Sequence, residues 1–243
     1  MLHLLEKPIE SAKPSRRSFL KMSAGAVGGL MLALRMPGTA QAASGAGDFA
    51  QPFVHIRPDN KVVVLIKHLD KGQGTATGLA TLVADELDAD EAQVETDFAP
   101  ANVELYKNLA FGMQGTGGST AMANSFIQYR TAGAAAKAML IAAAAELWSV
   151  PAGEITVSKG VIDHKSGRSA SFGELAGLAA TQNVPAEPAL KKPEDWIYIG
   201  KSFPRVDVPA KSSGSVGLFG MDHQAENMLV AVLARPPKFG ATA

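Results

Sequence analysis

One long apolar stripe constrains the fold of this chain more than any other feature of its sequence. Uncharged side chains recur at steps of four and three residues, the spacing of one helix face, at Met122, Phe126, Tyr129, Gly133, Ala136, Leu140, Ala143 and Leu147. The second half of the stretch is unusually rich in alanine, so neighbouring elements can pack closely on both faces. The pattern therefore predicts a long helix that is buried rather than exposed.

Shorter elements surround this helix in the sequence, and together they predict an α+β fold. Two strands, 53–57 and 61–67, form a hairpin across Pro58-Asp59-Asn60. A helix follows from about Thr75 to Leu87, with Leu79, Leu82, Val83 and Leu87 on one face. Further elements are expected at 93–98 (strand), 154–158 and 161–164 (hairpin), and from a capping box at Ser171 to about Ala180 (helix).

Beyond residue 181 the composition changes. Residues 182–194 are rich in proline, lysine and glutamate, which indicates a linker. Two strands, Trp196 to Ile199 and Met228 to Ala234, are expected in a second unit.

The first 42 residues resemble a twin-arginine export signal. Ser15-Arg16-Arg17-Ser18-Phe19-Leu20-Lys21 is followed by an apolar run, Met22 to Leu34, that is too short to span a bilayer as a helix. Ala40-Gln41-Ala42 then supplies the small-x-small pattern of a signal peptidase site. A membrane anchor or a core helix is the alternative. We expect a signal peptide at 1–42, a leader at 43–52 and a periplasmic protein, exported with its cofactor already inserted.

Composition excludes several classes of function. The formal net charge is zero, so there is no global basic field for nucleic acid. Cysteine is absent, which excludes disulfides and cysteine-ligated iron–sulfur clusters within this chain. The five histidines are scattered, and no pair has the spacing of a metal site, so we expect no protein-ligated metal. The acidic residues Asp85, Glu86, Asp88, Asp90 and Glu91 lack calcium-loop spacing, and a solvated helix end is the favoured interpretation.

Two glycine-rich loops remain as candidates for chemistry. Gly72-Gln73-Gly74 and Gly115-Thr116-Gly117-Gly118-Ser119-Thr120 each precede a predicted helix, where backbone N–H groups and the helix dipole favour an anion. Gln73 offers a donor and an acceptor at a fixed place. Ser119 or Thr120 could cap the long helix. Each loop taken singly could equally be a tight turn that needs positive φ.

The two loops carry a family resemblance. With the stretch 82–88 after the first loop and 124–126 and 130–134 after the second, the chain resembles the large subunit of molybdenum hydroxylases, the xanthine oxidase family. It is most similar to the exported branch of isoquinoline 1-oxidoreductase β-subunits and aldehyde dehydrogenases. Residues 171–176 match a further family stretch, and 208–211, 219–222 and 228–237 look like the opening of an α/β hammerhead domain. One departure is Asp70-Lys71, where relatives often show Glu-Met.

The resemblance implies a domain order and a truncated chain. Residues 53–181 would be the first part of a molybdopterin-binding domain, 182–195 a linker, and 196–243 the start of the hammerhead. The family's large subunit continues far beyond this length, and its catalytic glutamate lies near the far end. The chain is therefore expected to be an N-terminal fragment that is inactive alone.

The resemblance also implies a function. The complete enzyme would hydroxylate an aldehyde or nitrogen heterocycle with oxygen taken from water, using molybdopterin, in its cytosine dinucleotide form, with molybdenum. Gln73 would be the catalytic residue, hydrogen-bonding an oxygen ligand of molybdenum, with Gly72 and Gly74 beside it. The loop Gly115, Thr116, Gly117, Gly118, Ser119 and Thr120 would hold the pterin or its nucleotide. Expected partners are a small [2Fe–2S] subunit and a cytochrome c acceptor, with the enzyme associated with the inner membrane.

Two other interpretations stay open. The polypeptide could be a non-catalytic exported fragment, from a truncated or frameshifted gene. It could also be an unrelated periplasmic binding protein whose glycine loops hold a small anion.

Overall fold

A computed structural model describes residues 49–50, 52–214 and 223–241. The chain divides into two compact units, Met1–Pro204 and Arg205–Ala243. The predicted signal peptide, and residues 219–222 of the expected hammerhead opening, lie outside the described residues.

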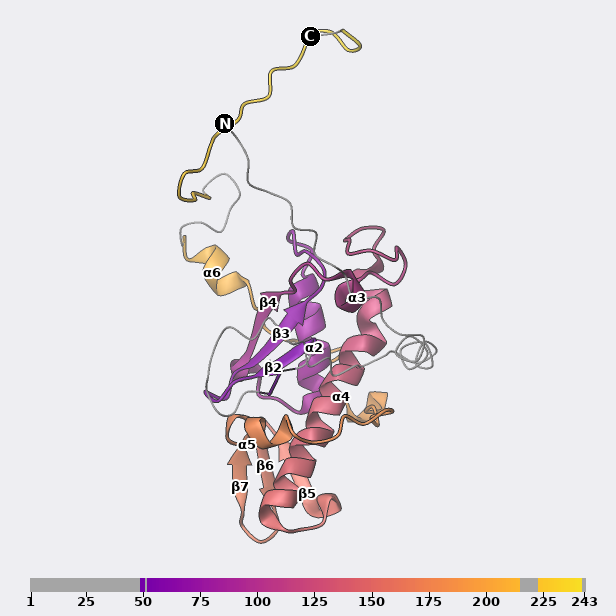
Figure 1. The fold of residues 1–243 in the computed structure, drawn as a ribbon, viewed down its shortest axis with the longest axis vertical. Helices are drawn as coiled ribbons and strands as arrows, with labels where there is room; N and C mark the ends of the chain where they lie inside the picture. Colours follow the sequence, from indigo (N-terminus) through magenta and orange to yellow (C-terminus); the bar gives the residue numbers. More distant parts are fainter. Residues whose placement is uncertain (1–48, 51, 215–222, 242–243) are drawn as a thin grey trace, which may run out of the picture. The chain divides into compact units, whose positions relative to one another are not determined.

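The first unit is built on a four-stranded sheet in the order β1-β2-β3-β4, shown in Figure 1. Its strands are β1 (Phe49–Ala50), β2 (Val54–Ile56), β3 (Val62–Ile66) and β4 (Val94–Phe98). β1, β2 and β3 pair antiparallel, which confirms the predicted hairpin. β3 and β4 are parallel, with α2 (Thr75–Leu87) between them in the chain. The two parallel strands therefore end at the same edge of the sheet.

The predicted long helix is confirmed as α4 (Thr120–Trp148), which packs against α2 and α5 (Figure 1). The centre of its stripe is fully buried, at Tyr129, Ala136, Leu140 and Ala143. Its two ends, Met122 and Leu147, are exposed. α2 also buries its predicted apolar face. Burial of both helices over the sheet forms the core of the unit.

A second, three-stranded antiparallel sheet lies at the far end of α4 (Figure 1). It contains β5 (Ile155–Ser158), β6 (Val161–His164) and β7 (Ser169–Ser171), followed by α5 (Phe172–Ala179). The capping box of α5 is confirmed, because Glu174 N–H donates to Ser171 Oγ and Ser171 N–H to Glu174 Oε2. Smaller elements are α3 (Val103–Tyr106) and 3₁₀ turns at Glu91–Gln93, Ala152–Glu154 and Pro193–Asp195. The mixed architecture confirms the α+β prediction.

Glu91 is exposed as expected, but the interpretation as a solvated helix end is wrong for Asp85, Glu86 and Asp88. Asp85 and Glu86 are 0% and 1% exposed. Arg130 lies 2.6 Å from Glu86 Oε1, and Lys191 Nζ lies 2.5 Å from Asp88 Oδ1. A buried carboxylate needs such partners, and these come from positions remote in sequence.

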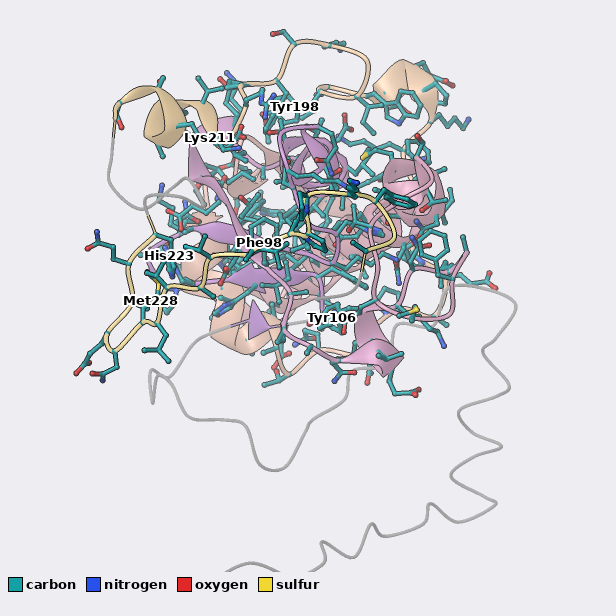
Figure 2. The ribbon with its side chains drawn as sticks, turned by 90° about the horizontal axis from the view of Figure 1, so that it is seen from above. Phe98, Tyr106, Tyr198, Lys211, His223 and Met228 are labelled. Atoms are coloured by element: carbon teal, nitrogen blue, oxygen red, sulfur yellow. The ribbon has the colours of Figure 1, made fainter. Side chains whose placement is uncertain are left out.

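The predicted strand at Trp196 to Ile199 is also wrong. This segment forms no ladder; instead the backbone N–H groups of Ile197, Tyr198 and Ile199 donate to Asp85 Oδ2 at 3.1, 2.8 and 2.8 Å. Tyr198, labelled in Figure 2, donates its hydroxyl to the carbonyl of Ala89 at 2.8 Å. The Asp85 carboxylate, rather than the carbonyl groups of a neighbouring strand, accepts the hydrogen bonds of this backbone.

The second unit contains α6 (Val208–Ser212). The strand predicted at Met228 to Ala234 is wrong, because none of the described residues pairs with this segment, and its apolar side chains are exposed. Helices long and apolar enough to cross a membrane do not occur in the described parts of either unit.

Candidate functional site

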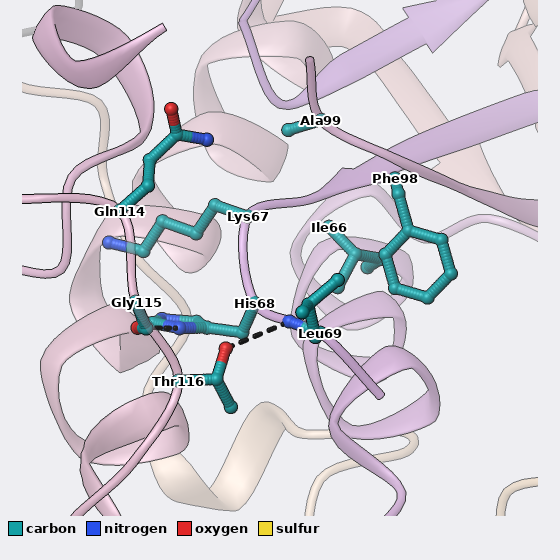
Figure 3. A pocket seen from close by; sticks show the side chains of 9 residues that line it. All are labelled: Ile66, Lys67, His68, Leu69, Phe98, Ala99, Gln114, Gly115 and Thr116. Atoms are coloured by element: carbon teal, nitrogen blue, oxygen red, sulfur yellow. Dashed lines mark hydrogen bonds between the residues drawn. The ribbon is translucent and has the colours of Figure 1, made fainter. Parts of the chain in front are cut away.

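The segment that leads from β3 to the first glycine-rich loop contacts the second loop, beyond the ends of β3 and β4. Residues 67–71 separate β3 from the first loop, and the second loop leads into α4. Leu69 N–H donates to Thr116 Oγ1 at 2.9 Å, and His68 Nδ1 lies 3.2 Å from the carbonyl oxygen of Gly115 (Figure 3). These contacts join segments 47 positions apart in the chain. The structure therefore joins the segment just before the first loop to the start of the second loop.

His68 fixes the second loop from beneath. Its ring is 1% exposed. The carbonyl of Gly115 can only accept, so Nδ1 carries the hydrogen and Nε2 accepts from the Ser125 hydroxyl, 3.1 Å away. Burial, and then the charge of Lys67, lower the pKa of His68, which keeps the ring neutral. His68, just after β3, thus links this part of the chain to the second loop and to α4 through its two hydrogen bonds.

Lys67 is a buried cation beside the same loops. Its Nζ donates to the Gln128 side chain at 2.6 Å, to Asn124 at 3.1 Å and to the carbonyl of Lys107 at 3.2 Å. Burial lowers the pKa of Lys67 to about 8. Neutral oxygens solvate this ammonium group, and no carboxylate is among its hydrogen-bond partners in the described chain. A positive charge is therefore held close to loops that are candidates for an anion.

Asn108 gives the second loop its shape. The side-chain amide, fully buried, donates to the Gly115 carbonyl at 3.1 Å and to Thr120 Oγ1 at 2.8 Å. Thr120 in turn donates its hydroxyl to the Gly117 carbonyl at 2.8 Å. The carbonyl groups of Gly115 and Gly117 are thereby engaged within the chain.

A small cavity of about 150 Å³ opens at this edge, as Figure 3 shows. Its lining includes Ile66, His68, Leu69, Phe98, Gly115 and Thr116. Phe98 and Leu69 are about half and two-thirds exposed. The cavity combines an apolar wall with the backbone of the second loop.

The first loop is closed by its own side chains. The Asp70 carboxylate accepts from the N–H groups of Gly72 at 2.9 Å, Gly74 at 3.4 Å and Ala76 at 2.9 Å. Gly72 and Gly74 have φ of 105° and 87°, so the turn itself requires glycine there. The anion position at the start of α2 is therefore filled from within the chain.

Gln73 is exposed at the tip of this loop and has its amide engaged locally. Nε2 donates to the carbonyl of Leu69 at 2.8 Å and to Thr75 Oγ1 at 2.9 Å, which uses both of its hydrogens. Oε1 accepts from Lys71 N–H at 2.7 Å. The amide is held in one orientation, and its oxygen keeps one acceptor position.

The second loop is open. In the described part of the chain, no hydrogen bond satisfies the backbone N–H groups of Thr116, Gly117, Gly118 and Ser119. Ser119 occupies the N-cap position of α4 with φ 54°, and its side chain makes no capping bond, so the predicted side-chain cap is wrong at Ser119. A helix start without a side-chain cap leaves its first backbone N–H groups available to another acceptor.

Glycine at position 117 has no explanation within the described chain. Its φ is not in the left-handed region, and an added Cβ would meet no atom within 4 Å. Gly118 needs glycine for its φ of 57°, and a Cβ on Gly115 would lie 3.3 Å from the Phe111 ring. Glycine at position 117 leaves the backbone of the second loop open to close approach by a ligand.

Sequence reasoning missed the polar groups under the loops, namely Lys67, His68, Asp70 and Asn108. Signals were available for three of them: a buried apolar strand continues directly into Lys67 and His68, and Asp70 precedes a glycine-rich helix start, as a capping residue does. Clusters of histidine, aspartate or glutamate that could hold a metal do not occur among the described residues.

Comparisons with known proteins agree on one family. Residues 12–210 match the model of the molybdopterin cofactor-binding domain. The chain is 34% identical to the beta subunit of isoquinoline 1-oxidoreductase from Brevundimonas diminuta over 223 residues, covering 77% of this chain and 28% of the relative. It is 29% identical over 243 residues to membrane-bound aldehyde dehydrogenase (pyrroloquinoline-quinone) of Gluconacetobacter polyoxogenes, covering 94% and 30%. One of the subunits of nicotinate dehydrogenase from Pseudomonas putida is 30% identical over 194 residues, covering 77% and 15%.

The chain spans less than a third of the length of each of these relatives. The family match, in contrast, covers most of this chain, including both glycine-rich loops and the helices that follow them. The chain therefore belongs to the molybdopterin cofactor-binding domain family.

Proposed function

We propose that this chain forms the cofactor-holding part of a molybdenum-dependent oxidoreductase that hydroxylates aldehydes or nitrogen heterocycles with oxygen from water. The family match and the names of the relatives, which include an isoquinoline oxidoreductase, an aldehyde dehydrogenase and a nicotinate dehydrogenase, support this proposal. Because the chain spans less than a third of those relatives, the activity is a property of the whole catalytic polypeptide.

The open second loop is the observation that carries the proposal. Thr116, Gly117, Gly118 and Ser119 present backbone N–H groups without partners in the described chain at the start of α4, and Gly117 leaves space above the backbone. Such an arrangement suits an anionic group, because the N–H groups and the helix dipole both favour negative charge. The buried Lys67 ammonium adds positive charge nearby. These residues fit the phosphate-bearing part of a molybdopterin cofactor, and we propose the cytosine dinucleotide form.

Gln73 is proposed to face the metal end of the cofactor. The bound group supplies the redox chemistry, and the protein positions it. An amide can hydrogen-bond there without adding charge, which neither lysine nor glutamate could do. Leu69, Lys71 and Thr75 already fix the orientation of the Gln73 amide, so little ordering is needed on binding. To donate outward, Nε2 exchanges its bond to Thr75 for one to the cofactor.

Gly117→Val tests the loop, with Gly153→Val as a matched control. Both glycines have ordinary φ, and an added Cβ at either meets no atom within 4 Å, so the two positions are equally open to a side chain at Cβ. Gly153 lies in the 3₁₀ turn before β5, away from the loops. Each variant is expressed in the native host, so that the protein is purified with its natural length and partners, and molybdenum and released cytidine nucleotide are measured per chain. Gly117→Val should lose most of both, whereas Gly153→Val should keep them. Equal cofactor content in the two variants would show that the second loop is only a turn.

We further propose export by the twin-arginine route, a small [2Fe–2S] partner subunit and a cytochrome c acceptor. The motif at Arg16 and Arg17 supports export, and the absence of cysteine supports a separate electron-transfer chain. Replacing both arginines with lysine should leave the precursor in the cytoplasm. Maturation of that variant in the periplasm would contradict the signal.

A further inference from the structure

The two glycine-rich loops differ in what their backbone N–H groups bind. At the second loop these groups lack partners in the described chain. At the first loop the Asp70 carboxylate accepts from Gly72, Gly74 and Ala76. Both loops open a helix of more than eight residues, so the helix dipole favours an anion at each. At the first loop this anion is the Asp70 carboxylate of the chain itself, whereas the second loop has no such carboxylate in the described chain.

Asp70 and Gln73 bind the first loop in an interleaved pattern. Asp70 takes the N–H groups of the even-numbered positions 72, 74 and 76. Gln73 takes groups on the odd-numbered positions 69, 71 and 75. The hydrogen bonds of each side chain therefore hold the backbone that carries the other side chain. Removing the Asp70 carboxylate should free the Gln73 amide from its fixed orientation.

We propose that Asp70 is a positioning residue for Gln73: its carboxylate fills the anion position at the start of α2 and so directs the anionic group of the cofactor to the second loop. The proposal rests on the proposed function, because it assigns the two loops different tasks toward the same cofactor. The first loop presents an oriented amide, and the second presents open N–H groups.

The first consequence concerns an external anion. In the wild-type chain, inorganic pyrophosphate should shift the backbone amide signals of Gly117 and Gly118 in ¹H–¹⁵N spectra of the full chain. The amide signals of Gly72, Gly74 and Ala76 should stay in place. In Asp70→Ala these three N–H groups lose their acceptor, so pyrophosphate should now shift them as well. Acetate, which replaces the missing carboxylate, should do the same, whereas chloride at equal ionic strength should not.

The second consequence concerns Gln73 and separates positioning from a general loss of stability. In the wild type, both hydrogens of the Gln73 side-chain amide donate, so their two signals should differ from those of a free amide. Asp70→Ala should move them toward free-amide values, and acetate should restore them. Asp70→Glu keeps a carboxylate and should behave as the wild type. Asp70→Ala should also melt lower by about 2–4 °C, a loss that acetate reverses in part.

Asp90→Ala is the matched control. Asp90 also caps a helical turn, accepting from Ala92 N–H at 2.8 Å, but it lies beyond the opposite end of α2. This variant should leave the Gln73 signals and the first-loop response unchanged.

The outcomes are decisive in both directions. A pyrophosphate response at Gly72, Gly74 and Ala76 in the wild type would overturn the inference, as would an unchanged Gln73 amide in Asp70→Ala. If the second loop stays silent while Asp70→Ala opens the first loop, the role of Asp70 is supported and the proposed function is contradicted. A variant too unstable for spectra leaves the wild-type titration as the deciding measurement.

Discussion

The contact between α2 and α4 can be tested by adding one methyl group. Gly133 lies on the buried stripe of α4 where the helix crosses α2. A Cβ at this position would lie 2.8 Å from the Val83 carbonyl oxygen and 3.0 Å from Glu86 Cβ. Because the first of these atoms belongs to the backbone, the two helices must separate to accept Gly133→Ala.

The expected size follows from two opposing effects. Alanine is favoured over glycine inside a helix by about 1 kcal/mol. Overpacking a close contact costs about 1–3 kcal/mol, and the upper half of this range applies where backbone must move. Gly133→Ala should therefore lower the free energy of unfolding by about 1–2 kcal/mol, which is a fall in melting temperature of about 3–6 °C for a chain of this size.

Gly78→Ala is the matched control. A Cβ at Gly78, in α2, would also lie 2.8 Å from its nearest neighbour, but that atom is Sδ of Met122, at the end of a flexible side chain. Met122 is exposed at the start of α4 and can turn aside. Gly78→Ala should therefore equal or exceed the wild type in stability. Thermal unfolding of the three proteins, followed by circular dichroism, measures the difference. Equal shifts in the two variants, or a Gly133→Ala protein as stable as the wild type, would refute the packing argument.

Three further outcomes are expected. Asp85→Ala should cost about 3–5 kcal/mol, because it leaves the backbone N–H groups of residues 197–199 without their buried acceptor and removes one of the two carboxylates beside Lys191, and it should speed tryptic cleavage after Lys191 relative to Asp85→Asn. Burial lowers the pKa of Lys67 to about 8 against 10.5, so the unfolded chain binds this proton more tightly and stability should rise between these pH values; urea unfolding of Lys67→Met against pH should lack that rise. In the molybdenum-containing enzyme, Gln73→Ala should keep its metal and lose roughly 10²–10³-fold in turnover, and unchanged turnover would exclude the residue from the site.

The elements that the sequence predicted correctly are those whose signal is local. The stripe of α4, the apolar face of α2 and the capping box at Ser171 each depend on residues within a few turns. The two failed strands share another cause. A strand needs a partner for its backbone, and the apolar runs at 196–199 and 228–234 carry no information about whether one is present.

The sequence predicted the two glycine-rich loops of the candidate site, but not the contacts that hold the second loop in place. Glycine spacing and the family resemblance indicated both loops. That His68 and Leu69 would hold Gly115 and Thr116 depends on contacts between segments 47 positions apart, which local patterns do not reveal. The first loop differs from the second because the Asp70 carboxylate accepts its backbone N–H groups. Those N–H groups belong to residues only two to six positions after Asp70 in the sequence. Local spacing could have revealed it, since an aspartate before a glycine-rich helix start is a capping pattern.

The acidic residues at the two ends of α2 are stabilised by different kinds of partner. Asp70, at the start, interacts favourably with the positive end of the helix dipole and needs only N–H groups from the first turn. Asp85 and Glu86 sit in the last turn, where the dipole disfavours negative charge and the helix offers no basic residue. Burial there requires cations from elsewhere, and Arg130 from α4 and Lys191 from the segment before Trp196 supply them. Acidic residues in the last turn of an apolar helix that has no basic residue there therefore predict that a basic segment from elsewhere in the chain packs against this end.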